Sequence, residues 1–343
     1  MSSAQTTASL LRMRVLVTGG AGFIGSHFAK RLVAGGDEVR VLDKLTYAGN
    51  PANLDGTGIE LVQGDIADPD DVAGAATGCD AVVNFAAETH VDRSILGPRE
   101  VIETNITGVQ TLLEHVRGTG ARLLHVSTDE VYGDLERGGS SGEDDSLRPS
   151  SPYSATKAAG ELQVFAYVRT YGVDALLTRG SNTYGPYQYP EKLLPLFLTN
   201  ALDGEPLPMY GDGRQVRDWL FVEDHCAGIE RALRDGRAGQ AYNIGGDDER
   251  ENREIVERVL AATGAPADLV RSVEDRAGHD RRYSLATAKA RDELGWSPQV
   301  TLEDGFARTA DWYRSNRAWW EPIKSSGGYR EYYREQYAER LRA

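Results

Sequence analysis

Short apolar runs recur along the first half of the chain, and they are too continuous for a sheet with one wet face. Six of them predict buried strands: Arg14–Thr18, Glu38–Leu42, Ile59–Gln63, Ala81–Phe85, Leu123–Ser127 and Asp174–Arg179. Helical patterns lie between these runs, at 22–34, 101–117 and 153–171. Alternation of this kind is typical of a parallel sheet that helices cover on both faces. The pattern predicts an α/β fold with a doubly wound parallel sheet.

The pattern changes from Ser181 onward, where glycine and proline are frequent and the predicted helices are shorter. Gln240–Ile244 has the character of a late strand that rejoins the sheet. We therefore predict a Rossmann-type domain and a smaller, interleaved C-terminal α/β lobe that binds the substrate. The predicted parts are a flexible leader at 1–12, the Rossmann domain at 13–187 with 219–248 rejoining it, and a lobe made of 188–218 and 249–343.

The charge balance narrows the choice of partners. Fifty-two acidic residues oppose 38 basic ones among 343, which gives a formal net charge of −14. Such a surface repels nucleic acid and anionic lipid, so neither is an expected partner. No apolar run approaches the roughly 20 residues of a membrane span. Two cysteines and six scattered histidines predict no disulfide framework and no metal site, and we expect a cytoplasmic protein.

A glycine-rich turn follows the first predicted strand. In RVLVTGGAGFIG, at 14–25, Gly19, Gly22 and Gly25 have the spacing that brings a backbone close to a pyrophosphate at a helix N-terminus. Asp43 ends the second strand, where its carboxylate can bind ribose hydroxyls and would repel a 2′-phosphate. The chain is thus predicted to bind NAD rather than NADP. The alternatives are a glycine turn that serves packing alone and an Asp43 that is merely solvated.

Two later strand ends lie along the expected path of the cofactor. Asp65 and Ile66 follow the third strand, where they would flank the adenine. The run Phe85, Ala86, Ala87 and Glu88 follows the fourth strand.

A possible catalytic group follows the fifth strand. Tyr153 and Lys157 are four residues apart at the start of a predicted helix, so they share a face. A lysine ammonium, together with the positive nicotinamide, favours a phenolate that takes a hydroxyl proton. Tyrosine and lysine occur at this spacing by chance in many helices. With the glycine turn and with Thr128 at a strand end, however, the combination resembles the extended short-chain dehydrogenase/reductase family.

Two adjacent carboxylates, Asp129 and Glu130, come directly after Thr128. The plainer interpretation is an acidic loop start. Beside a site of hydride transfer, however, an acid and a base complete an elimination of water, because a 4-keto group acidifies the neighbouring C–H.

The resemblance is more specific over the whole chain from Met13 to about residue 320. The stretches GGAGFIGS, AAETHVDRSI, STDEVYG, YSATKA, SNTYGPYQYPEKLLP, LPMYGDG, VRDWLFVEDH and GHDRRY resemble, in order, the dTDP-glucose 4,6-dehydratase family. The resemblance implies a lyase that uses tightly bound NAD, regenerated in each turnover, to convert dTDP-glucose into a 4-keto-6-deoxy sugar nucleotide. It implies that Tyr153 and Lys157 serve C4 oxidation, that Thr128 bonds the 4-oxygen, that Glu130 removes the C5 proton and that Asp129 protonates the leaving C6 hydroxyl.

The resemblance also implies binding residues. Further cofactor contacts are Phe23, Ile24, Lys44, Leu45, Thr46, Thr104 and Asn182. Substrate contacts, besides Thr128 and Asn182, are Thr89, Lys192, Leu193, Pro208, Tyr210, Arg217, Asn252, Arg276, His279 and Tyr283. We expect a basic pocket from Lys192, Arg214, Arg217, Arg276, Arg281 and Arg282. A surface salt bridge is the plainer interpretation of Arg217.

The family packs helices that match 101–117 and 153–171 into a four-helix interface, which implies a homodimer. Two other functions stay open. One is a related enzyme, either a dehydratase for UDP-glucose or a 4-epimerase, and an epimerase would not need Asp129 and Glu130. The other is an NAD-binding protein without catalysis, since such folds are reused for binding.

Overall fold

A computed structural model describes residues 12–135, 138–275, 278–337 and 340–341, so the predicted leader lies outside the described residues except for Arg12. Its centre is a sheet of seven parallel strands in the order β10-β6-β5-β4-β1-β2-β3. The strands are β1 (Arg14–Thr18), β2 (Glu38–Asp43), β3 (Glu60–Gln63), β4 (Ala81–Asn84), β5 (Arg122–Thr128), β6 (Ala175–Gly180) and β10 (Ala241–Ile244). The predicted doubly wound sheet is confirmed, and the late strand at 240–244 joins its edge beside β6. The division into domains stays a prediction.

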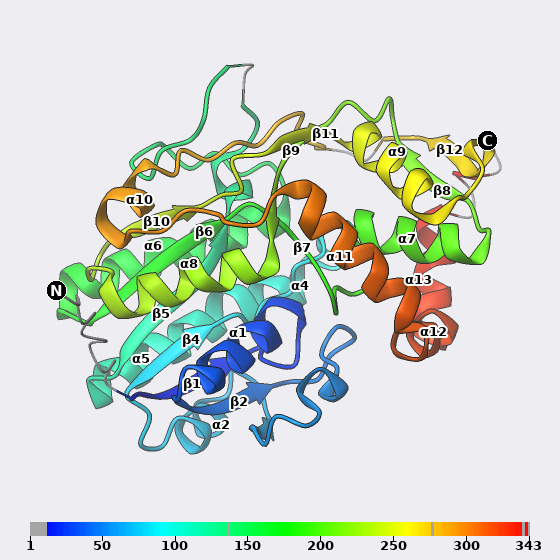
Figure 1. The fold of residues 1–343 in the computed structure, drawn as a ribbon. Helices are drawn as coiled ribbons and strands as arrows, with labels where there is room; N and C mark the ends of the chain where they lie inside the picture. The colour runs from blue at the N-terminus through cyan, green and yellow to red at the C-terminus, as the bar shows by residue number, and fades with distance from the viewer. Residues whose placement is uncertain (1–11, 136–137, 276–277, 338–339, 342–343) are drawn as a thin grey trace, which may run out of the picture.

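Alternate residues of each strand enter different cores, as period-two geometry requires. Val15 and Val17 of β1 belong to the core that contains α1 (Phe23–Ala34) and α8 (Val222–Asp235). Leu16, between them, belongs to the core on the other face. Figure 1 shows α1 and α8 on the near side of the sheet, with α5 and α6 behind it. Because both faces are covered, each strand contributes apolar side chains to both cores.

Helices α2, α5 and α6 cover the second face. They are α2 (Pro69–Ala75), α5 (Val109–Thr119) and α6 (Pro152–Tyr171). The predicted helices at 22–34 and 153–171 agree with α1 and α6 to within a residue at each end. The helix predicted at 101–117 is instead divided into α4 (Pro98–Ile102), a π-helical stretch η2 (Glu103–Gly108) and α5.

The π-helical stretch turns two consecutive side chains, those of Thr104 and Asn105, toward the interior. Thr104 lines a cavity at the sheet edge. The buried Asn105 accepts from the backbone N of Glu88 and donates to its carbonyl, each over 3.0 Å. A π turn contains an extra residue, so two consecutive side chains can face inward here.

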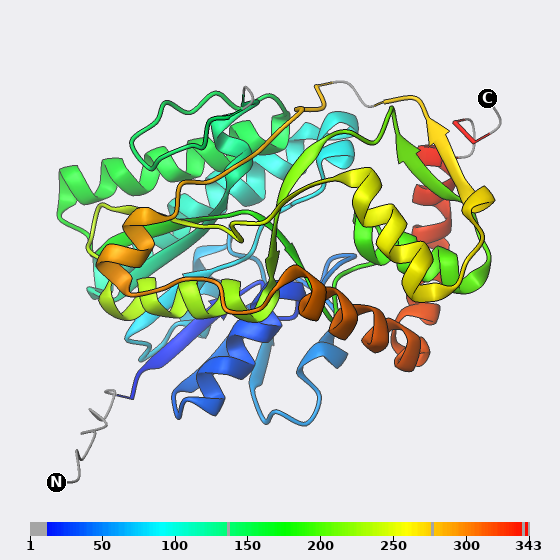
Figure 2. The ribbon, with the colours of Figure 1, turned by 45° about the horizontal axis from the view of Figure 1, so that its top comes forward.

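The remaining elements form short connections and the C-terminal lobe. Connections are η1 (Pro51–Leu54), α3 (Val91–Leu96), η3 (Asp129–Tyr132) and α10 (Ala288–Leu294). The lobe region contains β7 (Asn182–Tyr184), α7 (Leu193–Asp203), β8 (Leu207–Tyr210), β9 (Val216–Phe221), β11 (Glu249–Glu251), α9 (Asn252–Thr263), η4 (Ala267–Leu269), β12 (Val270–Val273), α11 (Leu302–Ser315), α12 (Arg317–Ser325) and α13 (Gly327–Tyr337). Strands β11, β9 and β7 form one small sheet, and β12 pairs with β8 in another. Both views place β8 and β12 with α7, α9, α12 and α13 at one end of the molecule (Figures 1 and 2).

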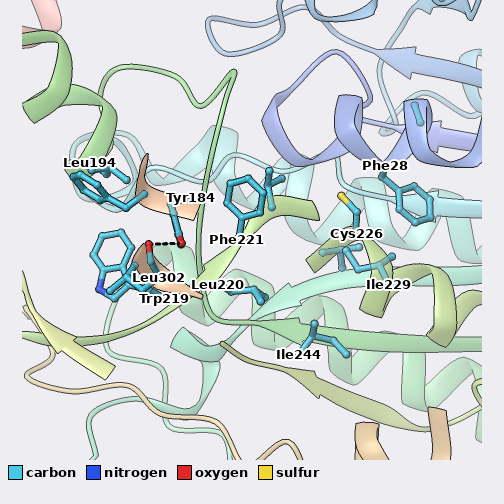
Figure 3. Close-up of a cluster of buried hydrophobic side chains, with 14 of the residues drawn as sticks. Phe28, Tyr184, Leu194, Trp219, Leu220, Phe221, Cys226, Ile229, Ile244 and Leu302 are labelled. Carbon is cyan, nitrogen blue, oxygen red and sulfur yellow. Dashed lines mark hydrogen bonds between the residues drawn. The ribbon is translucent and has the colours of Figure 1, made fainter. Parts of the chain in front are cut away.

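One continuous core joins the two parts of the molecule. Figure 3 shows Phe28 of α1 and Ile229 of α8 at one side of this core, and Phe221, Trp219 and Leu194 toward the lobe. All five are buried. Because this core is continuous, the two parts pack directly against each other. Within the described part of the chain, no helix combines the length and apolar character that crossing a bilayer requires.

Candidate active site

A cleft opens at the carboxyl ends of the central strands β1 and β4. The order of the strands reverses between these two, because β2 and β3 follow on the side of β1 and β5 and β6 follow on the side of β4. Open parallel sheets bind ligands at such a switch point. The cleft consists of a cavity of about 330 Å³ over the sheet and a second of about 180 Å³ toward the C-terminal lobe. The two share five lining residues: Glu130, Asn182, Thr183, Gln188 and Lys192. One elongated ligand, or two ligands end to end, can therefore lie across them.

The glycine turn packs tightly against neighbouring backbone and lines the first cavity. Gly19 has φ +66°, and a Cβ there would lie 2.6 Å from the backbone N of Ala86. A Cβ on Gly25 would collide with the carbonyl oxygen of Gly19. Helix α1 begins at Phe23, and its free N–H groups face the same cavity. This cradle fits the pyrophosphate of a dinucleotide.

Asp43 is held at the end of β2 by backbone donors. Its two carboxylate oxygens accept from the N of Ala21 (2.9 Å) and of Leu45 (2.8 Å). Burial raises the pKa of Asp43, while these hydrogen bonds act to lower it. Asp43 lines the first cavity, so the interpretation as a merely solvated residue is wrong.

Leu45 is the predicted cofactor residue that lines neither cavity. Its backbone has φ 57°, its side chain packs against the main core, and its N–H holds Asp43. Its contribution to a cofactor site is thus through Asp43. The other predicted cofactor residues all line the first cavity: Gly19, Gly22, Phe23, Ile24, Gly25, Asp43, Lys44, Thr46, Asp65, Ile66, Phe85, Ala86, Ala87, Glu88, Thr104, Tyr153, Lys157 and Asn182.

Several lining residues of the first cavity were not predicted. Ala48 and Gly49 follow β2, and Gln188, Tyr189 and His225 come from beyond the sheet. Gln188 and Tyr189 lie in the motif SNTYGPYQYPEKLLP, which was a signal available in the sequence. His225 of α8 ends the motif VRDWLFVEDH, so the sequence carried the same kind of signal for it. Its approach to the cavity depends on Gly180, where a Cβ would lie 2.5 Å from the imidazole.

The carboxylate pair occupies a 3-10 turn, η3, directly after β5. Thr128 caps this turn, since its Oγ1 accepts from the N of Glu130 (3.3 Å) and donates to Asp129 Oδ1 (3.2 Å). Asp129 is only 3% exposed. Burial, the neighbouring Glu130 and Asp218 raise the pKa of Asp129 to about 8. Asp129 is therefore protonated near neutral pH and can donate a proton.

Tyr153 and Lys157 project from the first two turns of α6, which Ser151 caps. Both line the first cavity together with Thr128, Asp129 and Glu130. The five predicted catalytic residues are thus brought together at one place.

The environment of Tyr153 differs from the expected one. We expected the ammonium of Lys157 to favour its phenolate. Burial and the carboxylates of Glu130 and Asp129 instead raise the pKa of Tyr153, and only the Thr128 hydroxyl lowers it among the causes resolved. The Lys157 Nζ donates to the carbonyl of Val126 (2.7 Å), and burial lowers its own pKa to about 8. Ionisation of Tyr153 therefore needs a further positive charge at the site.

The second cavity collects the predicted substrate residues from both lobes. It is lined by Asn182, Lys192, Leu193, Pro208, Tyr210, Arg217, Asn252, His279 and Tyr283, while Thr89 and Thr128 line the first cavity. Arg276 lies outside the described residues. Residues His90, Asp92, Glu191 and Tyr337 also line this cavity and were not predicted.

Arg217 is buried, so its interpretation as a surface salt bridge is wrong. Its guanidinium donates to the carbonyls of Val216 (2.8 Å) and Asp280 (3.0 Å) and lies 4.4 Å from the ring centre of Tyr283. The side chain is thereby fixed with its charge beside the cavity.

The predicted basic pocket is smaller than expected. Of its described members, only Lys192 and Arg217 line the cleft. Arg281 pairs with Asp212, and Arg282 pairs with Glu249. These pairings could not be read from the sequence, because their partners lie 69 and 33 residues away.

The C-terminal helix α13 closes the far end of the cleft. Gln336 Nε2 donates to the hydroxyl of Tyr210 (2.6 Å), and the ring of Tyr210 meets that of His279 edge to face. Among the described residues, no group of three or more histidine, cysteine, aspartate or glutamate side chains is arranged to hold a metal ion.

Comparisons with known proteins agree with this geometry. Residues 16–309 match the family model described as GDP-mannose 4,6 dehydratase. The chain is 52% identical over 324 residues to dTDP-glucose 4,6-dehydratase of Streptomyces niveus, covering 91% of this chain and 96% of the relative.

Solved structures show the same relationship. The crystal structure of DesIV, the dTDP-glucose 4,6-dehydratase of Streptomyces venezuelae, with NAD bound, superposes with a TM-score of 0.89 at 54% identity, covering 91% of this chain and all of that one. The UDP-glucose 4-epimerase of Thermus thermophilus, in complex with NAD, superposes with a TM-score of 0.84 at 34% identity, covering 89% and 100%. The chain therefore belongs to the dTDP-glucose 4,6-dehydratase family.

Proposed function

We propose that this protein is a hydro-lyase that removes water from dTDP-glucose to give dTDP-4-keto-6-deoxyglucose. The observation that carries the proposal is the buried Asp129 beside the half-buried Glu130, in the same cavity as Tyr153. Oxidation at C4 alone requires only the tyrosine and a dinucleotide. A protonated carboxyl group and a second carboxylate beside the same sugar supply the acid and the base that elimination of water requires.

The cofactor that fits the first cavity is NAD, which when bound supplies reversible hydride transfer at the sugar carbon. The glycine cradle would hold its pyrophosphate, and the fixed carboxylate of Asp43 would bind the ribose hydroxyls while repelling a 2′-phosphate. Its positive nicotinamide is the further charge that Tyr153 needs to ionise near neutral pH.

The chain's own groups then divide the chemistry. Tyr153 accepts the proton of the sugar 4-hydroxyl, and Thr128 hydrogen-bonds that oxygen. Glu130 removes the proton from C5, which the 4-keto group has made acidic. Asp129 donates its proton to the departing C6 hydroxyl, for which its raised pKa suits it. Return of the hydride to C6, and of a proton from Glu130 to C5, then gives the 4-keto-6-deoxy sugar.

The nucleotide part of the substrate would bind in the second cavity. Arg217 and Lys192 would face the diphosphate, and Tyr210 with His279 would hold the base near α13. Most of the remaining predicted substrate residues line the rest of this cavity.

The test is to incubate the purified protein with dTDP-glucose, and in parallel with UDP-glucose, without added NAD, and to measure product masses. Loss of one water from the dTDP sugar alone supports the reaction, the base preference and a retained cofactor. Loss from the UDP sugar alone contradicts the substrate. An epimer without mass change contradicts the role of the carboxylate pair and favours the epimerase alternative.

We also propose a homodimer formed through α4, η2, α5 and α6. Three large apolar side chains, Ile102, Leu162 and Tyr171, are each more than 45% exposed on α4 and α6. Exposed apolar groups on neighbouring helices favour burial against a second copy. Light scattering after size exclusion tests this, and a mass of one chain contradicts it. The negative surface charge and the reaction are consistent with a cytoplasmic enzyme.

A further inference from the structure

A buried polar network lies beneath the candidate site and is centred on Arg179 of β6. This side chain is 2% exposed. Its guanidinium holds Glu161 in a forked pair, with Nε 3.0 Å and Nη2 2.7 Å from Glu161 Oε2. Glu161 is itself wholly buried.

The same guanidinium reaches a second partner on its other edge. Arg179 Nη1 donates to the hydroxyl of Tyr132 (2.5 Å) and to the carbonyl of Glu143 (3.0 Å). The Tyr132 hydroxyl in turn donates to Asn243 Oδ1 of β10 over 2.9 Å. The hydroxyl thus both accepts and donates, which fixes the end of the ring.

The positions of these partners in the chain connect the network to the site. Tyr132 is the last residue of η3, the turn that begins with Asp129 and Glu130. Glu161 lies on α6, one turn after Lys157 and two turns after Tyr153. In Figure 1, β6 lies in the sheet with α6 behind it, so Arg179 bridges the two elements that carry the two halves of the chemistry.

Apolar packing follows the same route. The ring of Tyr132 belongs to a small buried cluster with Val131, Leu285 and Ala158, the residue after Lys157 on α6. The turn and the helix therefore touch through both the ring and its hydroxyl.

Stability alone is a weak reason for this arrangement. Burying a charged pair costs desolvation, and apolar residues of similar volume often stabilise a core as well or better. The planar fork of arginine instead fixes the directions of two partners at once. A rigid link of this kind is useful where two elements must present groups to one small molecule.

We propose that Arg179 and Tyr132 are positioning residues that hold the η3 turn in register with α6, so that Asp129 and Glu130 meet the same sugar whose 4-hydroxyl Tyr153 deprotonates. This inference rests on the proposed function. It assigns neither residue a contact with the substrate.

The first variant is Tyr132→Phe, which keeps the ring and removes only the hydroxyl. We expect dehydration of dTDP-glucose to fall by about 10- to 100-fold with KM within about twofold, because small misplacements of reacting groups are costly. Exchange of the C5 proton of the 4-keto product with deuterated water, followed by NMR, should slow by the same factor. Oxidation of dTDP-6-deoxyglucose, which has no hydroxyl to lose, should change by less than about threefold.

Tyr242→Phe is the matched control. Tyr242 is also buried on β10, and its hydroxyl bonds Glu293 Oε2 and the N of Arg237, but it belongs to the core on the opposite face of the sheet. Its loss should leave proton exchange within about twofold of the parent. The two variants could instead show equal losses of stability, of the rate of C5 proton exchange and of the rate of C4 oxidation. In that case the role of Tyr132 is structural only and the proposal is wrong.

The second variant is Arg179→Lys, which keeps a cation beside Glu161 but lacks the fork. It should reproduce the selective loss of proton exchange. The double variant with Tyr132→Phe should be no slower than the slower single variant, because both break one link. Multiplying effects, or unchanged exchange in Tyr132→Phe, contradict the positioning role. Failure of the parent to dehydrate dTDP-glucose contradicts the proposed function instead, so the two failures are distinct.

Discussion

The two ends of the cleft are built in different ways. The end over the sheet is made largely of backbone: a glycine cradle, the first turn of α1 and an aspartate that two N–H groups hold. The end near α13 is made of side chains from segments far apart in sequence, such as Arg217, Tyr210 and Tyr337. Regular elements suit a ligand part that many enzymes share, whereas side chains are what a protein changes to select a particular ligand.

The largest effect is expected where the two ends meet. Asp129→Asn with Glu130→Gln should lower water loss by about 10²- to 10⁴-fold, because both proton transfers are removed. Oxidation at C4 should persist, since Tyr153 and Lys157 are intact. Product mass spectrometry checks the first effect, and absorbance of reduced NAD checks the second. Dehydration at the parent rate would contradict the assignment of acid and base.

The cofactor end should tolerate the smallest side chain poorly. Gly19→Ala puts a methyl group 2.6 Å from the backbone N of Ala86, and the φ of residue 19 is +66°. Neither the backbone of Ala86 nor that of residue 19 can move easily. We expect the NAD content of the purified protein to fall at least tenfold, for a strain of about 1–2 kcal/mol or more. Gly74→Ala is the control, because nothing lies within 4 Å of a Cβ there. Full NAD content in Gly19→Ala would show that the turn is not a tight cradle.

The nucleotide end should respond in KM. Arg217→Gln removes a fixed cation beside the cavity, so KM for dTDP-glucose should rise by about 10- to 100-fold with kcat little changed. Arg281→Gln, an exposed residue paired with Asp212, should stay within about twofold in KM. Equal effects of the two changes on KM would contradict the assignment of Arg217, rather than Arg281, to the substrate site.

The smallest effect is a pH dependence at the junction. Because the pKa of Asp129 is about 8 rather than its usual 3.8, the acid loses its proton as pH rises through 8. Dehydration should then fall by up to about tenfold per pH unit. The folded state also keeps a proton that the unfolded state has lost above pH 4, so the free energy of unfolding falls as pH rises over this window. Urea unfolding at pH 6 and pH 9 checks this, and Asp129→Asn should show a smaller fall; an equal fall contradicts the shift.

Much of the sheet end was predictable because it rests on local patterns. The strand at 14–18, the glycine turn and Asp43 follow from apolar runs and fixed spacing, and the structure places them as predicted. The place of Leu45 outside both cavities was not predictable, because its left-handed backbone, which directs its N–H to Asp43, leaves no pattern in the sequence.

The other end was predictable only in part. Resemblance supplied Arg217 and Tyr210, but not the closure by α13 or the approach of His225 past Gly180. The network of Arg179 also escaped prediction, since its partners are 18 and 47 residues away on other elements. Such contacts depend on tertiary packing, which the local pattern of apolar and polar residues does not reveal.

The π-helical stretch at Glu103–Gly108 has a consequence for chain length. Because a π turn holds one residue more than an α turn, deleting one residue here would turn it into a regular α-helical turn and keep α4 and α5 close to their present phase. Thr104 or Asn105 would leave the interior, while Leu112 and Leu113 would still face the core they now fill. A chain that is one residue shorter in this segment should therefore keep its fold and lose one inward-facing side chain.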